Sequence, residues 1–365
     1  MEIGIIGLPQ SGKTTVFNAL THGKADTAAH SKATPEPNVG VAKVPDDRLK
    51  GLENIFHPPK TVYAEVKYID VAPPRDFGKG EGVSGHFLEH LSLVDALIHV
   101  VRAFPDETVP HVEGSIDPER DIASFELELA FSDLTIIQRR LTRIADTLKG
   151  AKPQERDALL REQTLMNRIK DALEKDIPIV AQSLTQEENK SISNYQFLTA
   201  KPLLIVLNIG EEQLSQASSI EEELRKHITR PDIQVAALCG KLEMELADLG
   251  DADAEDFRLS MGLTEPEANR ILRLSQELLG LITFLTAAPN EVRAWTVTSG
   301  ITAVRAAGKI HSDLERGFIR AEVIGYNDLV RCGSMAEVRK RGMLRLEGKT
   351  YVIQDGDVIT FLFNV

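Results

Sequence analysis

The sequence has few of the features that mark secreted or membrane proteins. Two cysteines among 365 residues are too few for a disulfide framework or a zinc site of their own. The longest nearly apolar run, residues 278–288, is far shorter than the roughly 20 residues that a membrane helix needs. The first residues carry no basic stretch and no small-residue cleavage site. We therefore expect a cytoplasmic protein with no signal peptide and no membrane partner.

Positive charge is also scarce. The formal net charge is −13, from 42 Lys and Arg against 55 Asp and Glu, which argues against a general affinity for nucleic acid. Salt bridges at a rim are the ordinary use of local basic clusters, and RNA contact is the alternative. The densest such cluster lies near the C-terminus and comprises Arg339, Lys340, Arg341 and Arg345.

A glycine-rich segment near the N-terminus predicts a nucleotide site. Residues 2–7 read as a short buried strand, and residues 7–14, GLPQSGKT, fit the phosphate-loop pattern just before a helix start. In such a loop, backbone N–H groups and the helix N-terminus bind phosphate oxygens. The residues expected to hold the nucleotide here are Gly7, Gln10, Ser11, Gly12, Lys13, Thr14 and Thr15.

Three side chains are expected to act on the phosphates. Lys13 would reach the β- and γ-phosphates, and the Thr14 hydroxyl would ligate Mg²⁺. The apolar run 64–69 ends in Asp70, as a magnesium-side carboxylate at the carboxyl end of a parallel strand should. Lys13 and Asp70 are therefore the catalytic candidates, and Mg²⁺ is the expected cofactor.

The spacing of the apolar runs indicates an α/β fold. Runs at 39–44, 64–69, 95–101 and 203–207 are separated by helical lengths, which predicts a parallel sheet with helices on both sides. From about residue 281 the chain turns to short β-rich runs, at 295–297, 319–323, 350–353 and 358–363, with a helical stretch at 303–311. This pattern predicts a small mixed α/β module.

A long helical insertion interrupts the predicted sheet. From residue 123 its apolar positions are spaced four and three in alternation, the pattern of a coiled-coil seam: Leu127, Ala130, Leu134, Ile137, Leu141, Ile144 and Leu148. A break at 150–153 and a second helix predict an antiparallel hairpin, with two ordinary core helices as the alternative. Arg139, Arg140 and Arg143 on the outer face are candidates for a phosphate backbone, or simply a solvated polar face.

The chain accordingly divides into three predicted parts. Residues 1–118 and 200–280 are expected to form the P-loop nucleotide-binding domain, and residues 119–199 the inserted helical arm. Residues 281–365 are expected to form the C-terminal α+β module.

Several further segments resemble one family, the YchF or Obg-like ATPases. Residues 34–40, TPEPNVG, resemble its switch I, and residues 78–82, GKGEG, its glycine-rich switch II. Residues 208–211, NIGE, look like its Asn-x-x-Glu form of the base-reading motif. Residues 307–322 and 354–357 are similar to its ubiquitin-like TGS domain. The resemblance covers nearly the whole chain.

The resemblance implies an NTPase that prefers ATP, or accepts ATP and GTP, and associates with ribosomes as a translation-related switch. It implies Thr34 as a second magnesium ligand, and Asn208 and Glu211 as the frame of the base. The residues agree in part: the extra methylene of Glu211 spoils the bidentate fit that aspartate makes to guanine, and Ile209 replaces a lysine. Helix capping is the other use of Asn208 and Glu211.

The sequence departs from the family pattern in two loops. Pro73 stands where the family has a glycine whose N–H senses the γ-phosphate, and proline has no N–H. Pro74 stands where other switch proteins carry the glutamine that positions water. His86 and His90 follow, as proton donors or as packing residues. Gln10 and Ser11 replace an Asn-Val pair that is linked to a K⁺ site in relatives, so potassium stimulation stays open.

Three functions remain at this point. The first is a slow ATP or dual-specificity hydrolase acting as a switch, with the ribosome and RNA as partners. The second is a nucleotide-binding scaffold with little or no hydrolysis, because of Pro73 and Pro74. The third is a small-molecule kinase, which the switch I and TGS resemblances disfavour.

Overall fold

The computed structural model describes residues 1–365 apart from 26–35, 73–84, 229, 231–232 and 365. The chain forms two compact units: residues 1–40 with 67–268, and residues 41–66 with 269–365. The three-part division of the sequence stays a prediction, with two differences. Residues 41–66 and 269–280, which we expected in the nucleotide-binding domain, pack with the C-terminal unit.

The first unit is built on the predicted parallel sheet. Its strand order is β2-β4-β1-β5-β6-β7, and β1 pairs in parallel with β4 and β5, as β6 does with β5 and β7. The strands are β1 (Glu2–Ile6), β2 (Asn38–Val44), β4 (Ala64–Asp70), β5 (Ala96–Arg102), β6 (Leu203–Asn208) and β7 (Gln234–Leu238). The α/β fold class is therefore confirmed, and β7 is a strand that the sequence analysis missed.

Burial explains why the central strands read as continuous apolar runs. Every residue of β5 and of β6 is buried, since helices cover both faces of the sheet. The helices of this unit include α1 (Lys13–Thr21), α3 (Gly85–Leu93), α7 (Ala217–His227), α8 (Gly240–Ala247) and α9 (Asp251–Ser260), with a 3₁₀ segment, η4 (Glu211–Gln216). Helix α10 (Glu267–Leu278) begins in this unit, but its residues from 269 onward belong to the second unit. Strand β1 runs through a loop into α1, as the phosphate-loop pattern requires.

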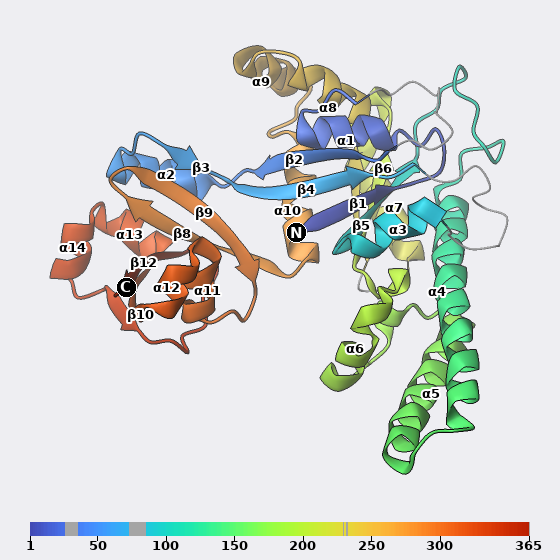
Figure 1. The fold of residues 1–365 in the computed structure, drawn as a ribbon. Helices are drawn as coiled ribbons and strands as arrows, with labels where there is room; N and C mark the ends of the chain where they lie inside the picture. Colours follow the sequence, from blue (N-terminus) through green and yellow to red (C-terminus); the bar gives the residue numbers. More distant parts are fainter. Residues whose placement is uncertain (26–35, 73–84, 229, 231–232, 365) are drawn as a thin grey trace. The chain divides into compact units, whose positions relative to one another are not determined.

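Two long helices form the expected arm (Figure 1). Helix α4 (Pro118–Leu148) is capped by Asp117, whose side chain accepts a hydrogen bond from Arg120 N, and α5 (Pro153–Leu173) packs on it. The arm core also takes residues from a later segment, with α6 (Gln186–Ile192), η1 (Ile179–Ala181), η2 (Ser193–Tyr195) and η3 (Leu198–Ala200).

The apolar seam predicted for α4 is confirmed at Ile137 and Ile144 but not at Leu127. Ile137 and Ile144 are fully buried, and Ile137 packs with Met166 and Ile169 of α5. Leu127, which we expected in the same seam, is 46% exposed, so the four-three pattern does not continue to the helix base.

The second unit is built on another six-stranded sheet, in the order β11-β10-β12-β8-β9-β3. Its strands are β3 (Thr61–Val62), β8 (Leu281–Ala288), β9 (Glu291–Thr298), β10 (Phe318–Gly325), β11 (Arg345–Glu347) and β12 (Asp357–Phe363). Its helices are α2 (Asp47–Phe56), α11 (Ala303–Ile310), α12 (Ser312–Arg316), α13 (Tyr326–Cys332) and α14 (Met335–Lys340).

The prediction for residues 350–353 was wrong. They form no strand, and only Val352 makes an isolated bridge, to Thr302. Strands β8 and β11 were not expected. The aromatic core lies between this sheet and α11, where Phe284 packs edge-on against Phe361 with ring centroids 6.0 Å apart.

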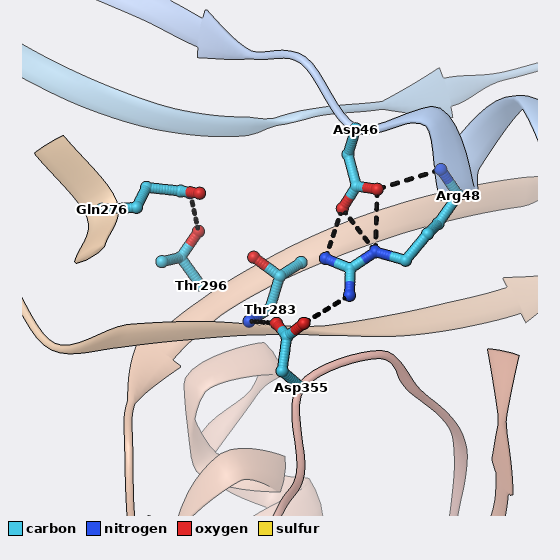
Figure 2. Close-up of polar contacts among 6 residues, drawn as sticks. All are labelled: Asp46, Arg48, Gln276, Thr283, Thr296 and Asp355. Atoms are coloured by element: carbon cyan, nitrogen blue, oxygen red, sulfur yellow. Dashed lines mark hydrogen bonds and ion pairs between the residues drawn. The ribbon is translucent and has the colours of Figure 1, made fainter. Parts of the chain in front are cut away.

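An arginine joins the segment 41–66 to the C-terminal sheet (Figure 2). Arg48 binds Asp46 through Nε and Nη2, at 2.8 and 2.7 Å, and Asp355 through Nη1, at 2.7 Å. Asp46 also caps α2, and the other oxygen of Asp355 accepts from Thr283 N. Strand β3 meanwhile pairs in parallel with β9, opposite Val292 and Arg293.

Over the part of the chain that the structure describes, no helix combines the length and the apolar character that crossing a bilayer demands.

Candidate nucleotide site

Two glycines allow the phosphate loop to close between β1 and α1. Gly12 has φ of +82°, and a Cβ there would lie 2.2 Å from Nδ2 of Asn208. A Cβ at Gly7 would lie 2.5 Å from the backbone oxygen of Val100. The Ser11 N–H donates to the carbonyl of Leu8, which closes the turn. Both glycines of the motif are therefore required by close contacts, and Gly12 also by its backbone conformation.

Three donors converge on the carboxylate of Asp70. Thr14 Oγ1 donates to Oδ2 at 2.7 Å, and Asn38 Nδ2 donates to the same oxygen at 3.2 Å. Lys13 Nζ lies 3.2 Å from Oδ1. Asp70 is only 3% exposed. The expected partners Lys13, Thr14 and Asp70 are thus brought together, and Asn38 joins them.

This arrangement fits Mg²⁺. Oδ1 of Asp70 is buried and, among the described residues, accepts no hydrogen bond, although Lys13 lies at ion-pair distance. A carboxylate and a threonine hydroxyl are the protein groups that magnesium uses beside phosphates and water. No cluster of three His, Cys, Asp or Glu residues stands ready as an alternative metal site in the described ranges. Thr34, the expected second ligand, lies outside the described residues.

A cleft of about 760 Å³ opens over the loop. Gln10, Gly12, Lys13, Thr14 and Thr15 line its phosphate end, whereas Gly7 and Ser11 shape the loop without lining the cleft. Three other segments complete the lining, with the apolar or weakly polar residues Phe104, Ile209, Cys239 and Met244 and the charged residues Asp106, Glu211, Glu212 and Lys241.

The thiol in this cleft behaves as an apolar group. Burial raises the pKa of Cys239 to about 11, so the thiol stays protonated near neutral pH. A neutral thiol beside Ile209 and Met244 suits the flat face of a purine. That the cleft takes phosphates at the loop and a base beside these residues stays a prediction.

Asn208 ties the phosphate loop to its surroundings. Its Nδ2 donates to the Ser11 carbonyl at 3.0 Å, and its Oδ1 accepts from the Gly240 N–H at 3.1 Å. Gly240 begins α8, so the amide caps a helix, but not the next one along the chain as we had considered. The side chain is 4% exposed and lines the cleft.

Glu211 lies at the rim of the cleft. Its side chain is 46% exposed, and Oε1 is 3.8 Å from Lys241 Nζ. It is the first residue of η4, but Gln213 is the residue whose side chain reaches back to the Gly210 N–H. Gln213, and not Glu211, therefore provides the side-chain cap of η4. Its contact with a base stays a prediction.

Sequence reasoning missed the wall that follows β5. Phe104, Pro105, Asp106, Thr108, Val109 and Pro110 all line the cleft. These residues carry no motif. Their place could have been inferred, since ligands of α/β sheets bind beyond the carboxyl ends of the strands.

The remaining candidates have varied placements. Pro73, Pro74 and the segment 78–82 lie outside the described residues, as does the side chain of His86; His90 is half-buried in α3. Arg140 is held by Glu162 at 2.7 and 2.8 Å, whereas Arg139 and Arg143 are exposed.

Each member of the C-terminal basic cluster has an acidic neighbour. Arg341 lies 2.7 Å from Glu337, which Lys340 also approaches at 3.9 Å. Arg339 pairs with Glu322, and Arg345 with Glu347 and Asp357. In the structure, these four residues therefore form salt bridges at the surface, as such charges ordinarily do.

Two family models match the sequence. Residues 2–137 match a family described as 50S ribosome-binding GTPase. Residues 281–364 match the YchF-GTPase C-terminal family, which is described as a protein of unknown function.

Whole-length relatives are also found. The chain is 41% identical over 368 residues to the Ribosome-binding ATPase YchF of Bacillus subtilis strain 168, with all of both chains covered. It is 37% identical over 365 residues to the protein of that name from Escherichia coli O157:H7, covering 100% of this chain and 99% of the relative. The solved structure of the Schizosaccharomyces pombe YchF GTPase superposes with a TM-score of 0.84 at 28% identity, covering 99% and 97% of the two chains.

Proposed function

The chain belongs to the YchF family, and on that premise we propose that it binds ATP, hydrolyses it slowly and associates with the ribosome in the cytoplasm. GTP is the second substrate in this proposal. The observation that carries this proposal is the convergence of Lys13, Thr14 and Asn38 on the buried carboxylate of Asp70, at the phosphate end of a purine-sized cleft.

The chemistry would come from positioning and charge rather than from a base. Phosphoryl transfer needs neutralisation of the phosphate oxygens more than covalent help. The Lys13 ammonium would move from Asp70 to the β- and γ-phosphates, and the Thr14 hydroxyl would turn to the metal. Asp70 would then hold the metal's water ligands. Mg²⁺, when bound, would neutralise negative charge on the phosphate oxygens; a K⁺ site beside it stays a prediction.

The base end favours adenine over guanine. A guanine-reading site presents an aspartate to N1–H and the exocyclic amine, and it rejects analogues strongly. Here Glu211 is longer and sits beside Lys241, and Ile209 occupies the place of the lysine. Both changes remove guanine-specific contacts, which supports a preference for ATP.

Ribosome association rests on the relatives' names, and RNA contact through the C-terminal module or the arm is part of the proposal. The four residues of the basic cluster already form salt bridges with carboxylates of this chain. To bind RNA they would have to give up these carboxylates for RNA phosphates. Co-sedimentation with ribosomes should weaken when Arg339, Lys340, Arg341 and Arg345 are all changed to Glu. Unaltered, salt-independent co-sedimentation would refute the RNA contact.

The course of the chain supports a switch. Residues 41–66 pack with the C-terminal unit, yet they join Asn38 to Asp70, two residues that meet at the metal site. Binding or hydrolysis of the nucleotide at that site would therefore act on β2 and β4. Through these strands it would reach the segment in which Arg48 forms its hydrogen bond to Asp355. Hydrogen exchange of α2 should change on addition of Mg-ATP, and an unchanged α2 would argue against the switch.

A nucleotide-gated scaffold is the second candidate. Pro73 cannot donate the γ-phosphate hydrogen bond, which by analogy with lost oxyanion donors costs about 2.7–4 kcal/mol of transition-state stabilisation. If the bond acts only in the ground state, about 1–3 kcal/mol is expected.

Single-turnover hydrolysis of ATP and GTP with Mg²⁺ separates these readings, in the wild type and in Pro73→Gly. Cleavage of ATP by the wild type supports the hydrolase. Binding without cleavage, restored by Pro73→Gly, supports the scaffold. A strict preference for GTP would overturn the interpretation of Ile209 and Glu211.

A further inference from the structure

Strand β5 ends in an arginine that is almost completely buried. Arg102 is 2% exposed and pairs in register with Asn208 of β6. Within the described residues, no carboxylate lies within ion-pair distance of its guanidinium. Buried charges are costly unless they are paired, so an arginine without a carboxylate partner calls for an explanation.

The guanidinium instead holds the backbone of the loop that follows. Nε donates to the carbonyl of Phe104 at 3.2 Å, and Nη2 donates to the carbonyl of Asp106 at 3.1 Å. The guanidinium carbon also lies 4.5 Å from the centre of the Phe104 ring. Nη1 has no partner among the residues that the structure describes. A planar fork that binds two carbonyls and stacks on a ring is a task that lysine cannot perform.

This loop is one wall of the cleft. Phe104, Asp106 and Thr108 line it, yet the loop has no helix or strand of its own. Beyond Arg102, its shape depends on a turn in which Asp106 accepts from the N–H and the hydroxyl of Thr108, at 2.8 and 2.6 Å. At its start, the Ala103 N–H donates to the Asn208 carbonyl. Arg102 therefore lies at the base of this wall, where its two hydrogen bonds add to those of Ala103 and Thr108.

We propose that Arg102 is a positioning residue for the nucleotide: it holds Phe104 and the 104–109 wall in place. The ligand class is the purine nucleoside triphosphate of the proposed function, on which this inference rests. The positive charge of Arg102 acts in the same direction, because a buried cation beside the cleft attracts a polyanionic ligand. Arg102 touches neither reacting atom, so it should affect binding and not the chemical step.

The test measures ATP affinity and the single-turnover rate at saturating ATP for Arg102→Gln. We expect the Kd for Mg-ATP to rise about tenfold to a hundredfold, the size of losing a hydrogen bond from a charged donor. The saturated rate should stay within about threefold. Arg102→Lys, which keeps the charge but loses the fork, should fall between wild type and Arg102→Gln.

Two further variants separate positioning from general stability. Arg225→Gln removes another bond from a guanidinium to a backbone carbonyl, Val235 O at 2.8 Å, away from the cleft lining, and should leave the Kd unchanged. Phe104→Leu should weaken ATP binding. The double variant Arg102→Gln/Phe104→Leu should lose less affinity than the sum of the losses in the two single variants.

The outcomes are distinct. A lower melting temperature for Arg102→Gln with an unchanged Kd would show a purely structural arginine and overturn the inference, as would a loss confined to the saturated rate. If Arg102→Gln does not fold, the same comparison is made with Arg102→Lys, and an unaltered Kd there also overturns it. If the wild type binds neither ATP nor GTP, the proposed function itself fails; if the wild type binds ATP and the variants bind equally well, only this inference fails.

Discussion

The two units each contain a cluster of charged side chains around carboxylates, and the clusters differ in how completely they are satisfied. At Asp70, a buried oxygen accepts no hydrogen bond within the described part of the chain. At Asp46, both oxygens are bound by Arg48, which also binds Asp355. The first cluster is arranged for groups that come from outside, whereas the second is closed. Removing a carboxylate should therefore damage function in one unit and stability in the other.

The largest effect is expected at the open cluster. Asp70→Asn should lower the single-turnover rate of ATP hydrolysis by about 10²–10³-fold, the range seen when one electrostatic group is lost from an active site. Its free energy of unfolding should fall by less than the about 2.7–4 kcal/mol that this rate loss represents, because asparagine still accepts hydrogen bonds from Thr14 and Asn38 and only the ion pair with Lys13 is lost. A stability loss as large as the activity loss would break the comparison.

The next effect is expected at the closed cluster. Arg48→Gln leaves Asp46 and Asp355 without their cation, and the free energy of unfolding should fall by about 1–3 kcal/mol, since the Arg48 side chain is 25% exposed. Urea unfolding measures this, with Lys50→Gln, at 71% exposure on the same helix, as the control without effect. ATP affinity should remain that of the wild type. Equal losses in both variants would mean that Arg48 is an ordinary surface charge.

A third carboxylate, Glu162 in the arm, makes the stability of the protein depend on pH. Hydrogen bonds from Arg140 and from Tyr195 hold the pKa of Glu162 below its ordinary value of 4.5. A depressed folded-state pKa stabilises the protein above the unfolded-state value, and this stabilisation is lost as pH falls through the folded-state pKa.

Glu162→Gln should therefore destabilise the arm at pH 6–7, and the difference from wild type should shrink below about pH 4.5. Chemical unfolding at several pH values, with Tyr195→Phe as a partner variant, measures this. A difference that grows toward low pH would contradict the sign.

The smallest effect is expected at the rim of the C-terminal unit. The Lys340 side chain is 80% exposed and lies 3.9 Å from Glu337, so Lys340→Gln should not change the unfolding transition measurably. A clear destabilisation would mean that the basic cluster contributes to the fold rather than to a surface.

The sequence was sufficient where a local pattern has a single structural meaning. The GLPQSGKT segment predicted the loop, and the apolar run ending in Asp70 predicted a carboxylate at the carboxyl end of that strand, where the structure places it 3.2 Å from Lys13. Strands β5 and β6 were predictable because strands buried on both faces are apolar throughout.

The sequence was insufficient where contacts between distant segments determine a residue's role or conformation. Asn208 was interpreted as a base contact or a cap of the following helix, but its amide joins the phosphate loop to α8, far along the chain. Residues 350–353 have strand-like composition, yet they make only a single bridge. Residues 41–66 looked like part of the first domain, and no local signal marks their packing on strands near residue 292.

The most direct test of the central claim is the magnesium dependence of ATP affinity. The ratio of the Kd in EDTA to the Kd in Mg²⁺ is measured by titration for the wild type, Asp70→Asn and Asp46→Asn. We predict a large ratio in the wild type and in Asp46→Asn, and a clearly smaller ratio in Asp70→Asn, since of these two carboxylates only Asp70 belongs to the proposed metal site. A ratio preserved in Asp70→Asn, or lost equally in both variants, would contradict the assignment of the open carboxylate to function and the closed one to the fold.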